Sequence, residues 1–278
     1  MKNRLRNRVS WVVYFLLFLV VLWTLVPFAW MFSTSIKSSW EVFNTPVYWI
    51  PKEPTLEQYR TVWTLTDFPR RFWNSLTISI SVTSISVLVS ILGGYALARP
   101  GLRAKETFGY CYLIAQMLPA VLLIIPIFIM MRNAGLIDTY WCLIFTYASF
   151  AVPFCTWMMK GVFQGIPEEL EQAGMIDGCT PLGAMIRLTL PVAVPGVIAT
   201  ALFAFILCWN EFIFALTLTN SPSMRTLPVG IASYIGHYTV EWGLITAEGV
   251  LVTIPVAVGF AFLQKYLVQG LTGGAVKG

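Results

Sequence analysis

The chain has 278 residues, of which 57% are hydrophobic and only 11% are charged, and its mean hydropathy is +0.73. Soluble domains carry roughly a quarter charged residues, so the composition excludes an ordinary soluble protein and predicts an integral membrane protein. The formal net charge of +5 is not gathered in an arginine-rich helix or in a basic run with interleaved aromatic residues. Nothing in the charge pattern therefore indicates nucleic-acid binding.

Six apolar runs are long enough to cross a hydrocarbon core about 30 Å thick, which requires about 20 mostly apolar residues per helix. They cover residues 11–32, 76–98, 107–131, 139–159, 192–219 and 249–264. Backbone groups in lipid must be satisfied within helices or closed barrels, and the alternating segments of about 10 residues that are typical of outer-membrane barrels are absent. The sequence predicts an all-α, polytopic membrane protein with six transmembrane helices.

The N-terminal run resembles a secretory signal, but it continues past the apolar core of about 7 to 15 residues that such signals have, so we interpret it as an uncleaved anchor. Positively charged residues favour the cytoplasmic side, and they place residues 1–10 and the C-terminus inside. The remaining chain, 11–278, is predicted to form one transmembrane domain. The cations that support this topology are Lys2, Arg4, Arg6, Arg8, Arg99, Arg103, Lys105, Lys160, Arg187, Lys265 and Lys277.

The first external loop is predicted to cover residues 38–73 and to form an ordered lid. Its four prolines forbid one long helix, while residues 56–63 fit a short helix capped by Thr55. In the span that follows, Gly93 and Gly94 and a set of serines provide small faces for close helix packing. For these serines (Ser79, Ser81, Ser84 and Ser86) packing and substrate binding both remain open. Kinks are expected at Pro119, Pro126 and Pro153, since proline removes a backbone donor.

A polar segment, residues 167–191, interrupts the apolar runs and is predicted to be a cytoplasmic docking loop of two short helices. The first helix starts near Pro167, with acidic residues at its positive end, and stops at Gly178, because glycine accepts the left-handed conformation. The second is capped by Thr180 and ended by Pro191. The amphipathic helices need an apolar surface, either the lipid or a groove in another protein. The acidic residues of the first helix would be repelled by an anionic inner leaflet, which favours a protein groove.

The residues of this loop resemble the EAA loop of the membrane subunits of ABC importers. That pattern is E-A-A, three residues, G, nine residues and I-x-L-P, and here it is matched by Gln172-Ala173-Gly174, Gly178 and Leu188-Thr189-Leu190-Pro191. Gln172 replaces the motif glutamate, and the neighbouring Glu171 is a candidate to serve in its place. The coupling residues that the resemblance implies are Glu171, Gln172, Ala173, Gly174, Asp177, Gly178, Leu188, Leu190 and Pro191.

Three further motifs occur in the order typical of one branch of that family. They are the segments 209–212 (WNEF), 226–230 (TLPVG) and 270–278 (GLTGGAVKG). With the loop, they make nearly the whole chain similar to the smaller permease subunit of carbohydrate importers related to the maltose system. The resemblance implies a type I fold in the bacterial or archaeal cytoplasmic membrane. It also implies a homologous second permease, two ATP-binding subunits that hold ATP and magnesium, an extracytoplasmic sugar-binding protein and a carbohydrate substrate.

Trp209, Asn210 and Glu211 are the candidate translocation-pathway residues. Glu211 is an ionisable residue in an otherwise apolar run, and an intramembrane carboxylate is costly enough to be a functional candidate. An aromatic ring, an amide and a carboxylate suit a sugar pathway, whereas a structural contact with another helix is the alternative explanation. Both remain open from the sequence.

No catalytic constellation, phosphate-binding glycine loop or metal-ligand spacing is visible in the sequence. Five cysteines (Cys111, Cys142, Cys155, Cys179 and Cys208) are interpreted as packing residues, and the lone His237 as a solvated side chain. We therefore expect a transporter subunit that is not an enzyme and holds no cofactor of its own. The alternatives are an ABC permease for an amino acid, a peptide or an osmolyte, then an ion-coupled secondary transporter, and last a membrane-embedded enzyme.

Overall fold

The structure is a computed structural model that describes residues 2–100, 107–110, 114, 117–236 and 239–273, with side chains from residue 11 to 265. Five residues interpreted above lie outside the described residues, and so does the end of the C-terminal motif, 274–278. These five are Arg103, Lys105, Cys111, His237 and Lys277. The chain forms two compact units. Unit 1 comprises Met1–Phe68 and Ile231–Thr253, and unit 2 comprises Pro69–Gly230 and Ile254–Gly278.

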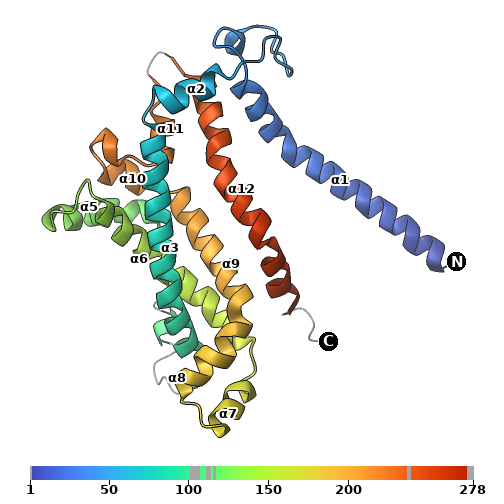
Figure 1. Cartoon of the computed structure of the whole chain (residues 1–278), viewed down its shortest axis with the longest axis vertical. Coiled ribbons are helices and arrows are strands. Elements are labelled where there is room, and N and C mark those ends of the chain that lie inside the picture. Colours follow the sequence, from blue (N-terminus) through green and yellow to red (C-terminus); the bar gives the residue numbers. More distant parts are fainter. Residues whose placement is uncertain (1, 101–106, 111–113, 115–116, 237–238, 274–278) are drawn as a thin grey trace. The chain divides into compact units, whose positions relative to one another are not determined.

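The regular secondary structure of the described residues is helical, and the only β-type pairing among them is an isolated bridge between Ile235 and Val240 (Figure 1). The all-α prediction is confirmed. The principal helices are α1 (Lys2–Ser35), α2 (Glu57–Thr64), α3 (Phe68–Ala98), α5 (Ile124–Asn133), α6 (Tyr140–Gln164), α9 (Leu190–Trp209) and α12 (Trp242–Gly273). Within the described part of the chain, five helical stretches are long and apolar enough to cross a membrane, and a shorter apolar stretch covers Ala120–Asn133.

Two predicted spans are not the single helices that their hydropathy indicates. The run 107–131 is interrupted at Leu118 and Pro119, where Pro119 is extended (ψ 120°), and continues as the 3-10 helix η2 (Ala120–Leu123) and α5. The run 192–219 is broken after Trp209 and resumes as the short helix α10 (Ile213–Leu218). Hydropathy reports partition into lipid, and it does not detect a chain that turns inside an apolar run.

The helix limits and one proline require further corrections. Pro126 occupies the first turn of α5, where its missing N–H costs nothing. Helix α6 continues through Pro153, and the kink expected there stays a prediction. Helix α3 begins at Phe68, so the external loop ends before residue 73, and α12 begins seven residues before the predicted position 249.

Unit 1 holds the loop that is predicted to be an external lid, here residues 36–66, against the end of α1. The lid contains the 3-10 helix η1 (Glu41–Phe43) and α2, which starts one residue later than predicted, with Thr55 Oγ1 accepting from the Glu57 amide at 3.1 Å. Tyr59 of α2 bonds to Ser35 Oγ at 2.7 Å. A Cβ on Gly249 of α12 would lie 2.9 Å from Met31 Sδ, so the first part of α12 packs closely on α1.

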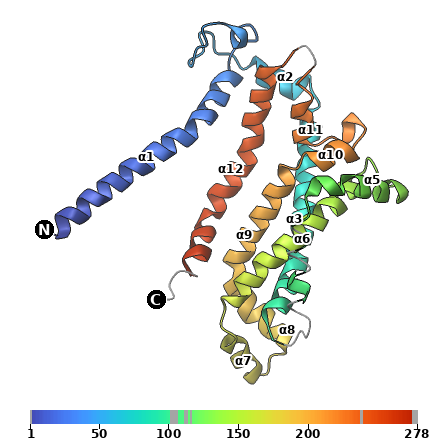
Figure 2. The same cartoon turned by 180° about the vertical axis from the view of Figure 1, so that it is seen from behind.

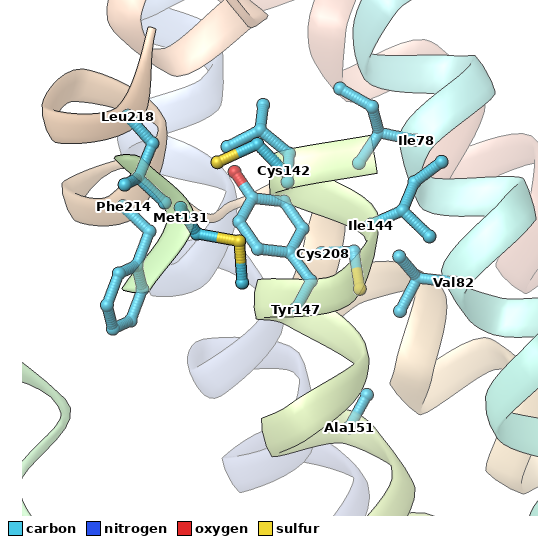
Figure 3. Packing of buried hydrophobic residues seen from close by; sticks show 11 residues of the cluster. Ile78, Val82, Met131, Cys142, Ile144, Tyr147, Ala151, Cys208, Phe214 and Leu218 are labelled. Atoms are coloured by element: carbon cyan, nitrogen blue, oxygen red, sulfur yellow. The ribbon is translucent and has the colours of Figure 1, made fainter. Parts of the chain in front are cut away.

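Unit 2 is built around a cluster of buried apolar residues from α3, α5, α6, α9 and α10, and Tyr147 lies in the middle of it (Figure 3). Helices α6 and α9 pack along each other (Figures 1 and 2). Three glycines allow neighbouring helices to approach α6 closely. A Cβ on Gly94 would lie 2.6 Å from Met159 Cβ, one on Gly93 would lie 3.1 Å from Thr156 Cγ2, and one on Gly196 would collide with Val162. Small residues allow such packing where lipid supplies no hydrophobic drive between helices.

The start of α3 in unit 2 is tied to the segment that connects α10 to α11 (Leu227–Ala232), which contains the 3-10 helix η4 (Pro222–Met224). Asn74 Nδ2 donates to the carbonyls of Ser223 and Arg225, both at 2.9 Å, and Ser75 Oγ accepts from the Leu227 amide at 2.8 Å. The segment 223–227 therefore has a structural role, and the motif 226–230 takes part in it through the Leu227 amide.

Gly196→Ala is expected to destabilise the protein by about 1 to 3 kcal/mol, because the added methyl group overpacks the contact with Val162. Thermal unfolding of the purified protein in detergent measures the change. Gly161→Ala in α6 is the matched control, since a Cβ there meets nothing within 4 Å and alanine favours a helix by about 1 kcal/mol. Val162→Ala should rescue Gly196→Ala, and equal melting temperatures for both glycine variants would contradict the packing argument.

Candidate functional site

The predicted docking loop forms the two short helices α7 (Glu169–Ile176) and α8 (Pro181–Ala184) on either side of Gly178. Gly178 has φ +90°, the left-handed conformation that the sequence predicted. Its amide donates to the Met175 carbonyl at 3.1 Å, and the Cys179 amide donates to the Gly174 carbonyl at 2.9 Å. Thr180 Oγ1 accepts from the Gly183 amide at 3.1 Å. The elbow and the cap are confirmed.

Pro191 does not end the second helix, contrary to the sequence-based prediction. Residues Pro181–Trp209 form one continuous helical stretch, with a π-helical segment, η3 (Met185–Thr189), between α8 and α9. In η3 the Leu190 amide bonds to the Met185 carbonyl, five residues back. Pro191 is then the second residue of α9, directly after the π-helical segment, so the helix passes through this proline.

Glu171 is the buried centre of this loop, with 7% of its surface exposed. Its Oε1 accepts from Arg99 Nε at 2.9 Å, from Arg99 Nη2 at 2.7 Å and from Thr189 Oγ1 at 2.7 Å. Its Oε2 accepts from the Tyr95 hydroxyl at 2.7 Å. Arg99, itself 8% exposed, also donates through Nη1 to the Phe163 carbonyl at 2.9 Å. We call Glu171, Arg99, Tyr95 and Thr189 the Glu171 hub; it joins α7 and η3 to the ends of α3 and α6.

The electrostatics of the hub keep the Glu171 carboxylate ionised. Burial by itself would raise the pKa of Glu171, but hydrogen bonds from Arg99, Thr189 and Tyr95, together with the charge of Arg99, hold this pKa below its usual value. A buried ion pair of this kind makes a protein little more stable than apolar side chains of similar volume would. Removal of one partner, however, leaves an uncompensated buried charge. The hub therefore fixes the position of α7.

Gly174 and Leu188, two of the motif positions, lie against each other. Gly174 is buried, and a Cβ there would collide with Leu188 Cδ1. Leu170 packs with Phe163 and Ala193 in a second apolar cluster under the loop. The inner side of the loop is thus occupied by contacts within unit 2.

The outer side of the loop carries an exposed apolar surface, which we call the exposed tip. It consists of Met175, Ile176, Leu182 and Ile186, and Ile176 is the most exposed of them, at 86%. Of the predicted coupling residues, Gln172, Ala173, Asp177, Gly178 and Pro191 are exposed, Leu188 and Leu190 are half-buried, and Glu171 and Gly174 are buried. The structure therefore separates the predicted set into a buried base and an outer surface.

The candidate pathway residues lie where α9 ends, so Glu211 is not inside a helical span as its sequence context indicated. Its two carboxylate oxygens accept from the Phe214 amide at 2.8 Å and the Ala215 amide at 3.0 Å, and it therefore caps α10. Asn210 is exposed and donates to the Ile206 carbonyl at 3.0 Å. Trp209 is 1% exposed, with its ring centroid 5.3 Å from that of Phe205.

The sequence did not identify three members of the hub or a second buried acid. In the sequence, Arg99 supports only the topology, as a loop cation, although its position at the end of an apolar run was a signal that it could be buried. Tyr95 and Thr189 carried no signal of a place in the hub. Glu248 of α12, which has no exposed surface and accepts from the Tyr234 hydroxyl, was missed because the predicted span began one residue later.

A sequence model of the family described as binding-protein-dependent transport system inner membrane component matches residues 86–273. The chain belongs to this family. The matched range contains the whole Glu171 hub. The chain is thus a multi-pass membrane subunit of an ABC transporter, a permease, and the predicted family is confirmed.

Individual relatives cover nearly the whole permease. It is 36% identical over 254 residues to the sulfoquinovosyl glycerol transport system permease protein SmoH of Agrobacterium fabrum, covering 91% of this chain and 89% of that protein. It is 35% identical over 259 residues to the trehalose/maltose transport system permease protein MalG of Thermococcus litoralis, covering 91% and 92%. Its fold matches a chain in the crystal structure of a bacterial ABC transporter involved in alginate import, with a TM-score of 0.80, 24% identity and coverage of 93% and 96%.

Glu171→Gln is expected to destabilise the permease by about 3 to 5 kcal/mol, because Arg99 becomes a buried charge without a counter-charge. Gln172→Ala, at the exposed neighbouring position, is the control and should melt like the wild type. The double variant Glu171→Gln with Arg99→Gln should recover part of the loss, since no unpaired charge remains. Equal melting of Glu171→Gln and Gln172→Ala in detergent would show that the hub does not hold the loop.

Glu211→Ala is expected to lower stability by about 0.5 to 2 kcal/mol, because two amides of α10 lose their acceptor. Glu211→Gln keeps one acceptor oxygen and should lose less. Assembly yield, melting temperature and uptake are measured for both variants, with Asn210→Ala at an exposed position as the control for the melting temperature alone. A change of uptake in Glu211→Gln with an unchanged melting temperature would instead assign Glu211 to the pathway.

Proposed function

We propose that this permease is the membrane subunit of an ATP-driven carbohydrate importer, in which it forms half of the translocation pathway. The observation that carries the proposal is the similarity over about nine-tenths of the chain to permeases named for sulfoquinovosyl glycerol and for trehalose and maltose. Both names describe sugar-containing solutes. The fold shared with a transporter that imports the polysaccharide alginate agrees with this assignment.

In this proposal the remaining partners are a homologous second permease, two ATP-binding subunits that hold ATP and magnesium, and an extracytoplasmic sugar-binding protein. The permease has both termini in the cytoplasm and uses no cofactor of its own. Its exposed tip is the part that enters a cleft of an ATPase subunit. The exposure of apolar side chains at the tip supports this role, and Ile176 is 86% exposed. Exposed apolar patches mark surfaces that another protein covers.

The Glu171 hub supplies the mechanical link in this mechanism. When the ATPase subunits close, they displace the exposed tip, and α7 cannot move independently because Glu171 is bonded to Arg99 and Tyr95 of α3. Arg99 also holds the Phe163 carbonyl of α6. The displacement is therefore passed to α3 and α6, which changes access to the pathway. Asn210, which is exposed, is the residue proposed to line it, with Glu211 as the cap beside it. Trp209 is buried and supports the pathway from behind instead of lining it.

The assignment is tested by reconstitution into liposomes of the permease with its second permease and ATPase, with the binding protein added. We expect ATP-dependent uptake of a sugar, and no ATP turnover by the permease alone. Uptake of an amino acid, a peptide or an osmolyte in place of any sugar would identify a different ABC permease. ATP-independent uptake driven by an ion gradient would overturn the ABC mechanism for this chain.

Gly178→Val is expected to uncouple ATP hydrolysis from transport while membrane insertion remains normal. A β-branched residue at φ +90° is strained by about 1 to 3 kcal/mol, and the strain misaligns α7 and α8. Gly178→Asn is the matched control, because asparagine tolerates the left-handed region, and it should keep most of the activity. Wild-type uptake by Gly178→Val would show that the geometry of the elbow is not needed for coupling.

A further inference from the structure

The external lid contains an uncharged segment, residues 46–51 (Pro-Val-Tyr-Trp-Ile-Pro), that lies beside the end of α1 within unit 1. The Trp49 ring packs edge-on against Trp30, with centroids 4.9 Å apart. The Trp49 carbonyl accepts from Ser33 Oγ, and the Tyr48 carbonyl accepts from Lys37 Nζ at 2.6 Å. Because these partners lie on α1 or just beyond it, the segment is fixed at the height where the helix changes from apolar to polar.

The change on α1 is abrupt. Apolar side chains are exposed along its described part up to Phe32, which is 55% exposed. Ser33, Thr34 and Ser35 follow and are buried. An exposed apolar band on a helix long enough to span a membrane faces lipid, so the hydrocarbon region ends near Phe32. Segment 46–51 folds back to this level and does not project beyond it.

The side chains of the segment have the chemistry of the membrane interface. Val47, Trp49 and Ile50 are 59%, 58% and 82% exposed. Tryptophan and tyrosine are enriched at the headgroup level because their rings combine apolar area with a polar group. Lys52 follows the segment with its ammonium 4.1 Å from the centre of the Tyr48 ring, and a lysine in this position is attracted to lipid phosphate.

We propose that segment 46–51 is a membrane-interface anchor that inserts Val47, Trp49 and Ile50 into the headgroup region of the bilayer at the end of α1. The occupant is lipid because this surface continues the lipid-facing band of α1. A surface for a soluble partner would project past the buried polar turn of Ser33 to Ser35. The anchor fixes the depth of α1 in the membrane and holds the lid down. It depends on α1 being a span and is independent of the transported solute.

The test is nitroxide labelling of single cysteines, Ile50→Cys and Val47→Cys, in the permease reconstituted in bilayers. In the background protein, Cys111 and Cys179 are replaced by serine, and the buried Cys142, Cys155 and Cys208 are kept. The background without an added cysteine measures the residual labelling. Glu53→Cys is the matched control, three residues away and exposed. Power saturation compares access of the label to oxygen, which concentrates in lipid, and to a water-soluble nickel chelate.

The anchor predicts that the ratio of oxygen to nickel accessibility is several-fold higher at positions 47 and 50 than at position 53. A ratio at position 50 equal to that at position 53 would place the segment in water and overturn the proposal. Shielding of position 50 from both reagents would show a protein cover, and it would equally overturn the proposal. All three positions are exposed, so melting temperatures near that of the unlabelled background are expected and confirm that the variants fold.

Discussion

The carboxylate of Glu171 is the constraint on which the inner end of unit 2 depends. A buried carboxylate is tolerated only when its charge is paired and its oxygens are hydrogen-bonded. Arg99, Tyr95 and Thr189 meet this requirement from three places in the chain, at sequence separations of 72, 76 and 18 residues. The same requirement places α7 against the ends of α3 and α6. Stability, geometry and, in the proposed mechanism, coupling thus share one set of contacts.

The separation of the loop into a buried base and an exposed tip explains how one short segment serves two purposes. The base uses Glu171 and Gly174, which have no surface left for a partner. The tip, with Ile176 and Leu182, makes few contacts of its own and is free to be covered. In the proposed mechanism, a loop that was mobile at its base would absorb the displacement made by an ATPase, whereas a loop fixed by an ion pair would transmit it.

Close helix packing supports this arrangement. Gly94 and Gly196 bring the backbones of α3 and α9 against α6, where larger residues would collide. In lipid, helices gain little from burying apolar surface against each other, so dispersion contacts between closely approaching backbones stabilise the bundle. In the lid of unit 1 it is the contact of Trp49 with Trp30, not burial in a protein core, that positions the apolar segment 46–51.

The sequence by itself determined the all-α class, the apolar runs and the local structure of the loop. Helix periodicity, the glycine at position 178 and the cap at Thr180 act over a few residues, and the structure has all three. The sequence did not determine where the runs 107–131 and 192–219 are interrupted, or that Glu211 caps α10. It also did not show that Arg99 is buried against Glu171. Those outcomes depend on which distant donors and acceptors the packing brings together, and hydropathy, which treats each window of the chain separately, carries no information about them.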